Sequence, residues 1–365
     1  GAPGSLPLQN YTHMIWVEGR YKNVPESTTK KIDTWLKSGG ILIGQKSATK
    51  WFSDKKWLKA FYPAFMKNSQ TGGKTYGIPF QRSTPVLYWN KEAFKKAGLD
   101  PEKAPANWDE MVAMGKKLTL KDAAGNVKQW GVRIPSSGFP YWLFQGLSTQ
   151  NDVILANSDG NKTNFDDPKV AEALQDLVDL SAKHEVMAPG ILEWGTTPKA
   201  FFEGQTAMMW TTTGNLTNVR ANAPFDFGVA MLPANIRRGA PTGGGNFYIF
   251  KESTDAQKAA SVDFVKWITA PEQAAKWSIA TGYVAPRADA WDTPAMQAYA
   301  KDFPPALIAR DQLKYAVAEL ATYENQRVTK IFNEALEAAI TGKSDPMTAL
   351  KEAQEKADKV LKAYR

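Results

Sequence analysis

Hydrophobic and polar positions form two repeating patterns along this chain, short apolar runs and longer stretches with an apolar residue every three or four positions. Residues 73–98 contain both patterns. Two runs rich in β-branched and aromatic residues, 76–80 and 86–89, predict two strands joined by a polar link. Pro85 lacks an amide donor and therefore belongs at the start of the second strand. Asn90 is predicted to cap a short helix that follows at once.

The first sixty residues alternate in the same way. Apolar runs at 14–17 and 41–44 predict strands, and the stretches 25–38 and 54–61 predict helices. A strand, a helix and a second buried strand form a βαβ unit, whose strands run parallel with a right-handed crossover. This order predicts an α/β protein.

Further strands and helices alternate to the end of the chain. The polar residues Asn107 and Glu110, which have capping-box spacing, begin one of the helices. Predicted strands cover 130–134, 206–210 and 227–232, and predicted helices cover 107–117, 168–180, 198–204, 255–268, 323–340 and 345–364.

Three segments carry a family resemblance. They are GKTYGIPF at 73–80, FFEGQTAMMWTTTGNL at 201–216 and TGYVAP at 281–286. From Tyr62 to the C-terminus the chain resembles the extracellular solute-binding proteins of bacterial ABC importers, in the group that binds carbohydrates and polyols. The resemblance implies a type II periplasmic binding protein fold, with two lobes of mixed, mostly parallel sheet flanked by helices.

The resemblance also implies lobe limits, a hinge and partners. The lobes are expected to close over a ligand and present the closed form to a membrane permease. Lobe one is expected to comprise 1–83 and 248–290, lobe two 88–242 and 296–365, and the hinge crossings 84–87, 243–247 and 291–295.

Residues 1–61 do not fit the family. The segment 34–52 is similar to an amidotransferase-like or flavodoxin-like fragment, so a chimera or natural fusion with a junction near Phe61 and Tyr62 is expected; the alternative is a divergent first lobe. Members of the family contact the ligand with the opening strand and helix of the chain. The altered start of this chain therefore predicts weak or lost binding. It also predicts an open sheet edge through which two copies pair.

Composition excludes several kinds of chemistry. Zero cysteines exclude thiol catalysis, and two distant histidines argue against a histidine-rich metal site. The net charge of +8 is spread along the chain, which argues against nucleic-acid binding. No apolar run suggests a membrane span, and Gly1–Ser5 reads as a linker left after an export signal was removed, which predicts a periplasmic location. No cofactor or metal is predicted.

Catalytic motifs are incomplete. The segment Gly73–Thr75 matches the end of a phosphate loop, but Asn68 stands where its first glycine is needed. No serine lies in a Gly-x-Ser-x-Gly setting. A glycosidase with two acids from distant positions stays an alternative, as does an enzyme built on the amidotransferase-like fragment. The prediction is a binding protein without covalent chemistry.

Polar bends at strand ends suggest the binding site. Each alone is explained by a capped turn, but all occur in the family's order, and such positions offer hydroxyls and free amides to a ligand. The resemblance implies that Tyr141 and Trp142 stack on the ligand, with a place under a loop as the alternative. Arg327 is expected to grip it by a forked pair of hydrogen bonds, with a helix-surface ion pair as the alternative. The predicted site residues are Ser83, Tyr141, Trp142, Thr212, Thr213, Gly244, Gly245, Tyr283 and Arg327.

The resemblance favours a small polyol phosphate as the ligand, either glycerol-3-phosphate or a glycerophosphodiester. A di- or oligosaccharide is the second candidate, since 13 tryptophans and 12 tyrosines offer rings on which sugars stack. A recombined scaffold that has lost ligand binding is the third.

Overall fold

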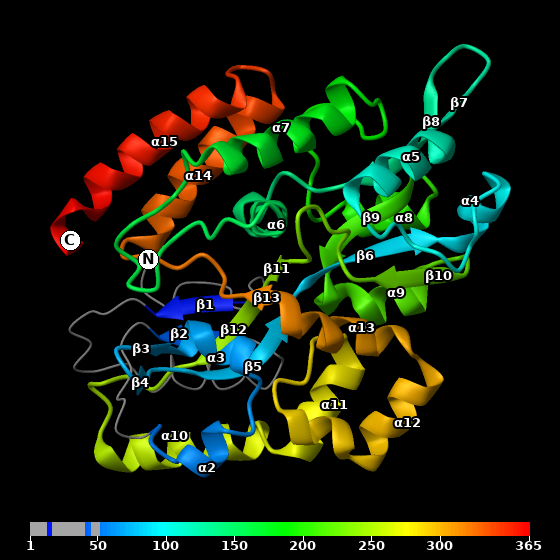
Figure 1. The fold of residues 1–365 in the computed structure, drawn as a ribbon. Helices are drawn as coiled ribbons and strands as arrows, with labels where there is room; N and C mark the ends of the chain where they lie inside the picture. The colour runs from blue at the N-terminus through cyan, green and yellow to red at the C-terminus, as the bar shows by residue number, and fades with distance from the viewer. Residues whose placement is uncertain (1–12, 17–40, 45–51) are drawn as a thin grey trace, which may run out of the picture.

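Two groups of secondary structure, one above the other in Figure 1, form the two lobes of this computed structural model. The structure describes residues 13–16, 41–44 and 52–365, and the helix predicted at 25–38 lies outside them. No helix in the described part of the chain has the length and apolar character needed to cross a membrane.

A five-stranded sheet organises the second lobe, in the order β10-β6-β9-β8-β7. β8 and β9 are parallel, whereas β6 is antiparallel to both β9 and β10. All six residues of β6 are buried, as expected for the central apolar run of the sequence. The strands are β6 (Pro85–Asn90), β7 (Leu120–Lys121), β8 (Val127–Arg133), β9 (Thr206–Thr212) and β10 (Phe227–Ala230).

Several helices of this lobe begin at residues that the sequence marks as caps. Asn90 Oδ1 accepts from the Ala93 amide at 3.0 Å, and Asn107 Oδ1 accepts from the Glu110 amide at 2.8 Å. The helices are α4 (Lys91–Lys96), α5 (Trp108–Leu118), α6 (Pro140–Gln150), α7 (Pro168–Ala182), α8 (Thr197–Phe202), α9 (Leu216–Asn222), α14 (Asn325–Ile340) and α15 (Pro346–Leu361).

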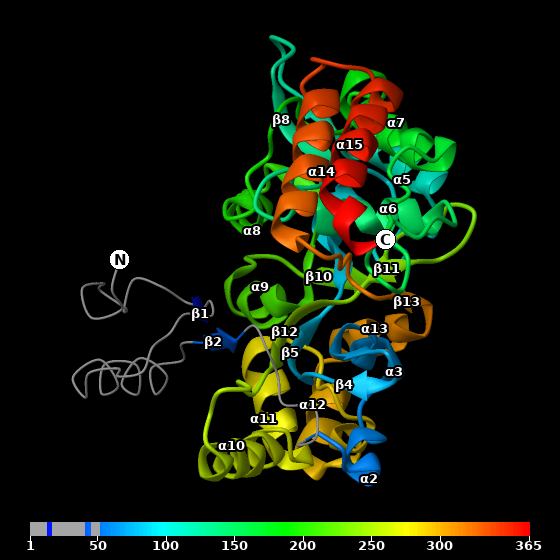
Figure 2. The same ribbon diagram turned by 90° about the vertical axis from the view of Figure 1, so that its left-hand side faces the viewer.

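The first lobe is built on short strand pairs. β1 (His13–Trp16) and β2 (Ile41–Gly44) run parallel, as predicted, whereas β5 (Ile78–Ser83) and β12 (Gly243–Phe247) run antiparallel. Its remaining elements are β3 (Gln70–Thr71), β4 (Lys74–Thr75), α2 (Lys55–Leu58), α3 (Pro63–Met66), α10 (Asp255–Ile268), α11 (Pro271–Thr281) and α12 (Pro294–Asp302). Figure 2 shows β1 and β2 on one side of β5 and β12, with α3 and β4 on the other.

Two chain crossings join the lobes close together. β5 pairs with β12, but β6 joins the second lobe's sheet, so the chain changes sheets at Thr84. The predicted polar link therefore differs from the structure: residues 81–83 continue β5, because they pair with the backbone of Gly243–Gly245. The second change of sheet falls at Thr242, between β11 (Ala240–Pro241) and β12.

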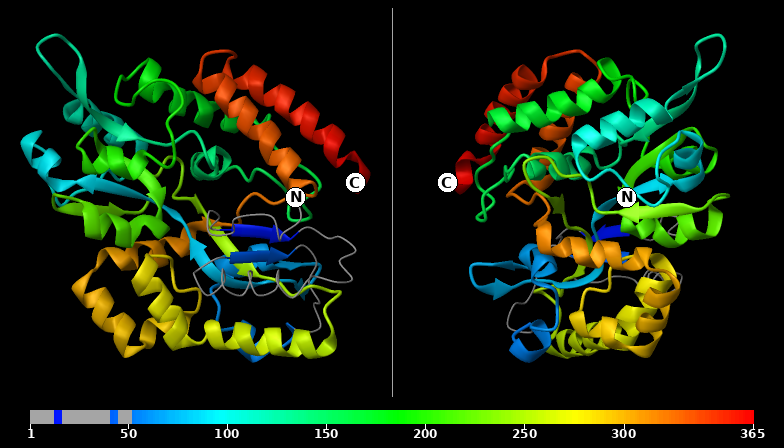
Figure 3. Two further views of the ribbon diagram at one scale, coloured as in Figure 1. Left: turned by 180° about the vertical axis from the view of Figure 1, so that it is seen from behind. Right: turned by 45° about the vertical axis from the view of Figure 1, so that its right-hand side comes forward.

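The third crossing was predicted at 291–295, and this limit stays a prediction. Trp291 and Met296 are buried with Phe65 in the core of the first lobe, so the chain stays there through α12. Phe303 belongs to the same buried cluster as Tyr88 of the second lobe, and α13 (Pro305–Gln312) follows it. β13 (Ala316–Val317) then runs parallel to β11 before α14 begins. Figure 3 shows α13 running between the two lobes.

Candidate functional site

The glycines of β12 explain how closely the crossing segments pack. Gly244 has φ +90°, and a Cβ there would lie 1.9 Å from the Gln81 carbonyl oxygen. A Cβ on Gly243 would lie 2.6 Å from the indole ring of Trp142. Glycine is therefore required because β5 and Trp142 approach the backbone directly. These contacts bring the predicted site residues Ser83, Gly244, Gly245 and Trp142 together.

Trp142 is part of the packing at this crossing. Its side chain is only 5% exposed, and its Nε1 donates to the Thr242 carbonyl at 2.9 Å. Trp194 meets its ring edge-on, with ring centroids 6.1 Å apart. The indole N–H is therefore occupied within the fold, and only ring contact is left for a ligand.

The ends of β5 and β9 bring three more predicted residues to the same place. The Thr213 amide donates to the Thr84 carbonyl at 3.1 Å, and Thr212 Oγ1 accepts from the Gly214 amide at 3.0 Å. A Cβ on Gly214 would lie 2.7 Å from the phenol ring of Tyr283. The strand-end hydroxyls and Tyr283 thus gather beside Ser83, since Val284 pairs with the last residues of β5.

Tyr141 and Arg327 each pair with a glutamate side chain. The Tyr141 hydroxyl donates to Glu319 Oε1 at 2.8 Å, and burial together with Glu319 raises the pKa of this phenol. The Arg327 side chain is 67% exposed, and its Nη1 lies 3.6 Å from Glu324. No contact among the described residues joins Arg327 to the other eight, so its ligand role stays a prediction.

A buried arginine at the crossing was not singled out from the sequence. Arg82 is 1% exposed, and its guanidinium donates to Thr242 Oγ1 and Asn246 Oδ1, each at 3.3 Å. It also lies over the Phe65 ring, with Cζ 5.4 Å from the centroid. Burial lowers the pKa of Arg82, and Glu319 acts against that shift. The sequence signal that could have identified Arg82 is its position directly before the polar Ser83–Thr84 bend.

Gln312 is a second residue that the sequence did not mark. Its Nε2 donates to Thr84 Oγ1 at 3.0 Å and to the Pro85 carbonyl at 2.7 Å. Its Oε1 accepts from the Leu232 amide at 2.9 Å. One buried side chain thus satisfies the backbone where the chain leaves the first lobe.

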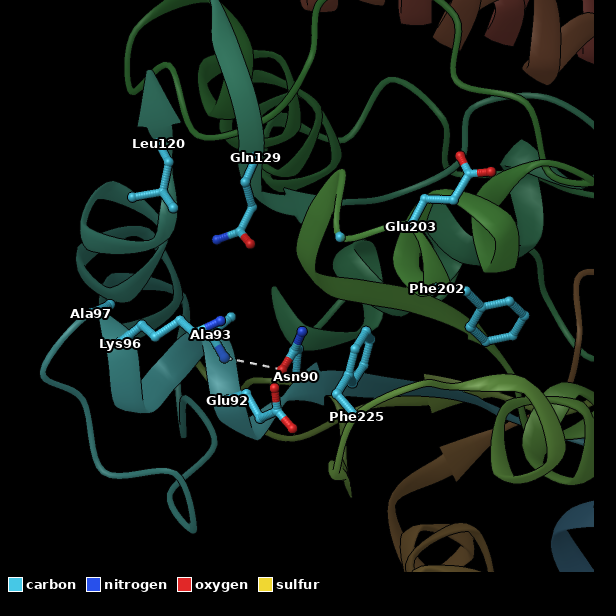
Figure 4. A pocket seen from close by; sticks show the side chains of 11 residues that line it. Asn90, Glu92, Ala93, Lys96, Ala97, Leu120, Gln129, Phe202, Glu203 and Phe225 are labelled. Carbon is cyan, nitrogen blue, oxygen red and sulfur yellow. Dashed lines mark hydrogen bonds between the residues drawn. The ribbon is translucent and has the colours of Figure 1, made fainter. Parts of the chain in front are cut away.

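Other cavities lie away from these residues. Figure 4 shows a pocket of about 310 Å³ in the second lobe, where the Asn90, Gln129 and Phe225 side chains converge. A larger groove of about 930 Å³ lies between the lobes. None of the nine predicted residues lines either one. Within residues 13–16, 41–44 and 52–365, no group of histidine, cysteine and acidic side chains could hold a metal ion.

Comparison with known proteins gives a family match. Residues 23–305 match the family described as bacterial extracellular solute-binding protein. The match begins before the junction expected near Phe61, and that junction stays a prediction.

Two curated relatives share a name. The sn-glycerol-3-phosphate-binding periplasmic protein UgpB of Yersinia pseudotuberculosis is 30% identical over 314 residues, covering 82% of this chain and 70% of the relative. UgpB of Pectobacterium atrosepticum is also 30% identical, covering 80% of this chain and 67% of the relative.

Two solved structures have the same fold. UgpB from Mycobacterium tuberculosis in complex with glycerophosphocholine superimposes with a TM-score of 0.74 at 23% identity, covering 86% of this chain and 77% of that one. Maltose-bound T. maritima MalE3 gives a TM-score of 0.74 at 19% identity, covering 97% and 99%.

Proposed function

The chain belongs to the family of bacterial extracellular solute-binding proteins, and from this premise we propose that it captures glycerol-3-phosphate or a glycerophosphodiester between its lobes. Proteins of this family bind small solutes and deliver them to ABC permease subunits. The proposed location is the periplasm. The ligand is bound and released without covalent change.

The observation that carries the proposal is the meeting of the polar strand ends at the crossing. Ser83, Thr213 and Tyr283 lie around one point where β5 and β9 end. Ligands of open α/β sheets bind outside the strand ends, where hydroxyls and free amides suit polyol and phosphate oxygens. Relatives at 30% identity carry glycerol-3-phosphate in their name, which sets the ligand class.

A neutral sugar is the second candidate. Several structural neighbours hold saccharides, including the cyclic alpha-maltosyl-1,6-maltose binding protein from Arthrobacter globiformis, which has a TM-score of 0.72 and covers 96% of this chain. The tyrosine at 283 and the ring of Trp142 offer contact surface to a sugar as well.

The lobe limits and the altered start belong to the same proposal. We place the crossings at Thr84, at Thr242 and between Phe303 and Leu320, which follows the changes of sheet and core. If residues 1–61 replace the family's ligand-contacting segment, affinity falls below that of the relatives. Pairing of two copies through a free sheet edge then gives a concentration-dependent mass in solution.

Calorimetric titration with glycerol-3-phosphate, glycerophosphocholine and maltose tests the function. We expect binding of one of the two phosphate compounds, and no binding of maltose that depends on Thr213 or Tyr283. Thr213→Val and Tyr283→Phe each remove one hydroxyl and should weaken binding about tenfold. Ser261→Ala removes a hydroxyl that donates to the Gln257 carbonyl within α10 of the first lobe, and it serves as the matched control.

The outcomes separate the candidates. Binding of maltose that weakens in Thr213→Val and Tyr283→Phe, without binding of the phosphate compounds, favours the sugar binder. If none of the three compounds binds, the recombined scaffold without a ligand is favoured. If Thr213→Val and Tyr283→Phe both bind the ligand as tightly as the original chain, the assignment of the site is wrong.

A further inference from the structure

A groove of about 930 Å³ runs along the seam between the lobes, and we call it the seam groove. Residues 67–71, Tyr76 and Tyr248 line it from the first lobe. Gln145, residues 154–160 and residues 317–323 line it from the second. Its size falls within the range typical of sites for small molecules.

The seam groove lies on the other side of the crossing strands from Ser83. Successive side chains of a strand point to opposite faces, so Ser83 and Arg82 of β5 face opposite ways. Arg82 faces Phe65 of α3 and donates to Thr242 Oγ1 at 3.3 Å. Thr242 Oγ1 in turn donates to Asn68 Oδ1, in the groove wall, at 3.1 Å. The seam groove is therefore distinct from the proposed glycerol-3-phosphate site.

The groove floor is held in place by side-chain amides. Asn68 Nδ2 donates to the Glu319 carbonyl at 2.9 Å, and the Glu319 amide donates back to Asn68 Oδ1 at 2.9 Å. Gln145 makes the same double contact, with the Ala318 carbonyl at 2.7 Å and the Leu320 amide at 2.9 Å. A rigid floor needs no ordering when a ligand arrives.

One floor group lacks a partner. Ser69 is 1% exposed, and its hydroxyl oxygen makes no hydrogen bond within the part of the chain that the structure describes. A buried hydroxyl left unpaired is unfavourable, so a ligand hydroxyl that reaches it gains a favourable contact. Because Ser69 lines the seam groove, this unmet hydrogen bond points to a ligand that carries hydroxyls.

The rim of the groove adds aromatic surface without a dominant charge. Tyr323 is 50% exposed, and Tyr76 and Tyr248 are partly exposed on the opposite lobe. Lys67 is the one basic residue among the lining residues and is offset by the acidic side chain of Asp159. Tyrosine rings with hydroxyl and amide neighbours suit the CH faces and hydroxyls of carbohydrates.

We propose that the seam groove is a second binding site, for a neutral oligosaccharide that contacts both lobes. Tyr76, Tyr248 and Tyr323 supply the ring contacts, and the Ser69 hydroxyl pairs with a sugar hydroxyl. Glu319 lines the groove, and burial raises the pKa of its carboxyl, which favours a neutral floor.

Hydrogen–deuterium exchange of the full chain with maltotriose locates the site. We expect protection of the backbone at 67–76 and 154–160. Protection restricted to segments that contain Ser83, Thr213 or Tyr283 overturns the proposal.

Titration with maltotriose provides the second measurement. Ser69→Ala and Tyr323→Ala should each weaken binding about tenfold, whereas Ser69→Thr keeps the hydroxyl and should retain it. Ser181→Ala removes a hydroxyl that donates to the Val178 carbonyl within α7, outside both sites, and is the matched control. An unchanged unfolding midpoint shows that each variant folds. If the Ser69→Ala and Tyr323→Ala variants both bind maltotriose as tightly as the original chain, the proposal is wrong.

Discussion

At the scale of single residues, the crossing between the lobes depends on missing side chains. Gly243 admits the Trp142 indole, and Gly214 admits the Tyr283 ring. Gly244 lies against the backbone of β5 with a positive φ. Such close approaches let polar strand ends meet in a small volume.

A comparison of Gly244→Ala with Gly245→Ala tests this view. In Gly244→Ala the new methyl group would lie 1.9 Å from the Gln81 carbonyl in a left-handed conformation, so we expect a loss of unfolding free energy of about 2 kcal/mol or more. Gly245→Ala is the control, because a methyl group there would have nothing within 4 Å of it. Urea unfolding measures both variants. Similar losses in the two would show that strain at Gly244 is not the cause.

At the scale of elements, local capping decides where several helices begin. α10 is an informative case because most of its surface is exposed and Val265 is its buried residue. Thr254 and Gln257 form a reciprocal capping box at its start, with contacts of 3.2 and 2.9 Å. Little tertiary packing supports this helix, so the cap carries much of its stability.

Thr254→Ala should therefore lower the unfolding free energy by about 1 kcal/mol. Ser261→Ala is the control within the same helix. Its hydroxyl donates to the Gln257 carbonyl inside the helix, and replacing such a residue by alanine is neutral or slightly stabilising. Denaturant unfolding and exchange of the α10 amides measure the effect. Equal stability of the two variants would contradict the capping argument.

At the scale of the whole molecule, buried polar groups join segments of the two lobes. Arg82 of β5 and Glu319 beyond β13 influence each other's protonation, although 237 positions, 319 minus 82, separate them in the chain. Burial raises the pKa of Glu319 above its ordinary value of 4.5, whereas Arg82 and the Tyr141 hydroxyl oppose the shift. The folded state therefore keeps this proton to higher pH than the unfolded state.

The stability contributed by protonated Glu319 is complete below its unfolded pKa and is lost as pH rises through the folded pKa. Glu319→Gln removes this dependence. Across the pH range that begins at the ordinary pKa of 4.5, we expect the variant to gain stability relative to the original chain as pH rises. Urea unfolding across this range gives the difference at each pH. A difference that stays constant with pH would show that Glu319 does not titrate differently in the two states.

The sequence by itself determined the α/β class, the family and the helix starts at Asn90 and Asn107, because a cap and a strand pattern depend on neighbours within a few residues. Tertiary structure alone decided that Arg82 is buried and that Asn68 pairs with Glu319, which lies 251 positions away. The tertiary structure also decided that the glycines of β12 pair with β5 and that Gly243 lies against the Trp142 ring. Such contacts depend on which distant segments pack together, and no local pattern records that choice.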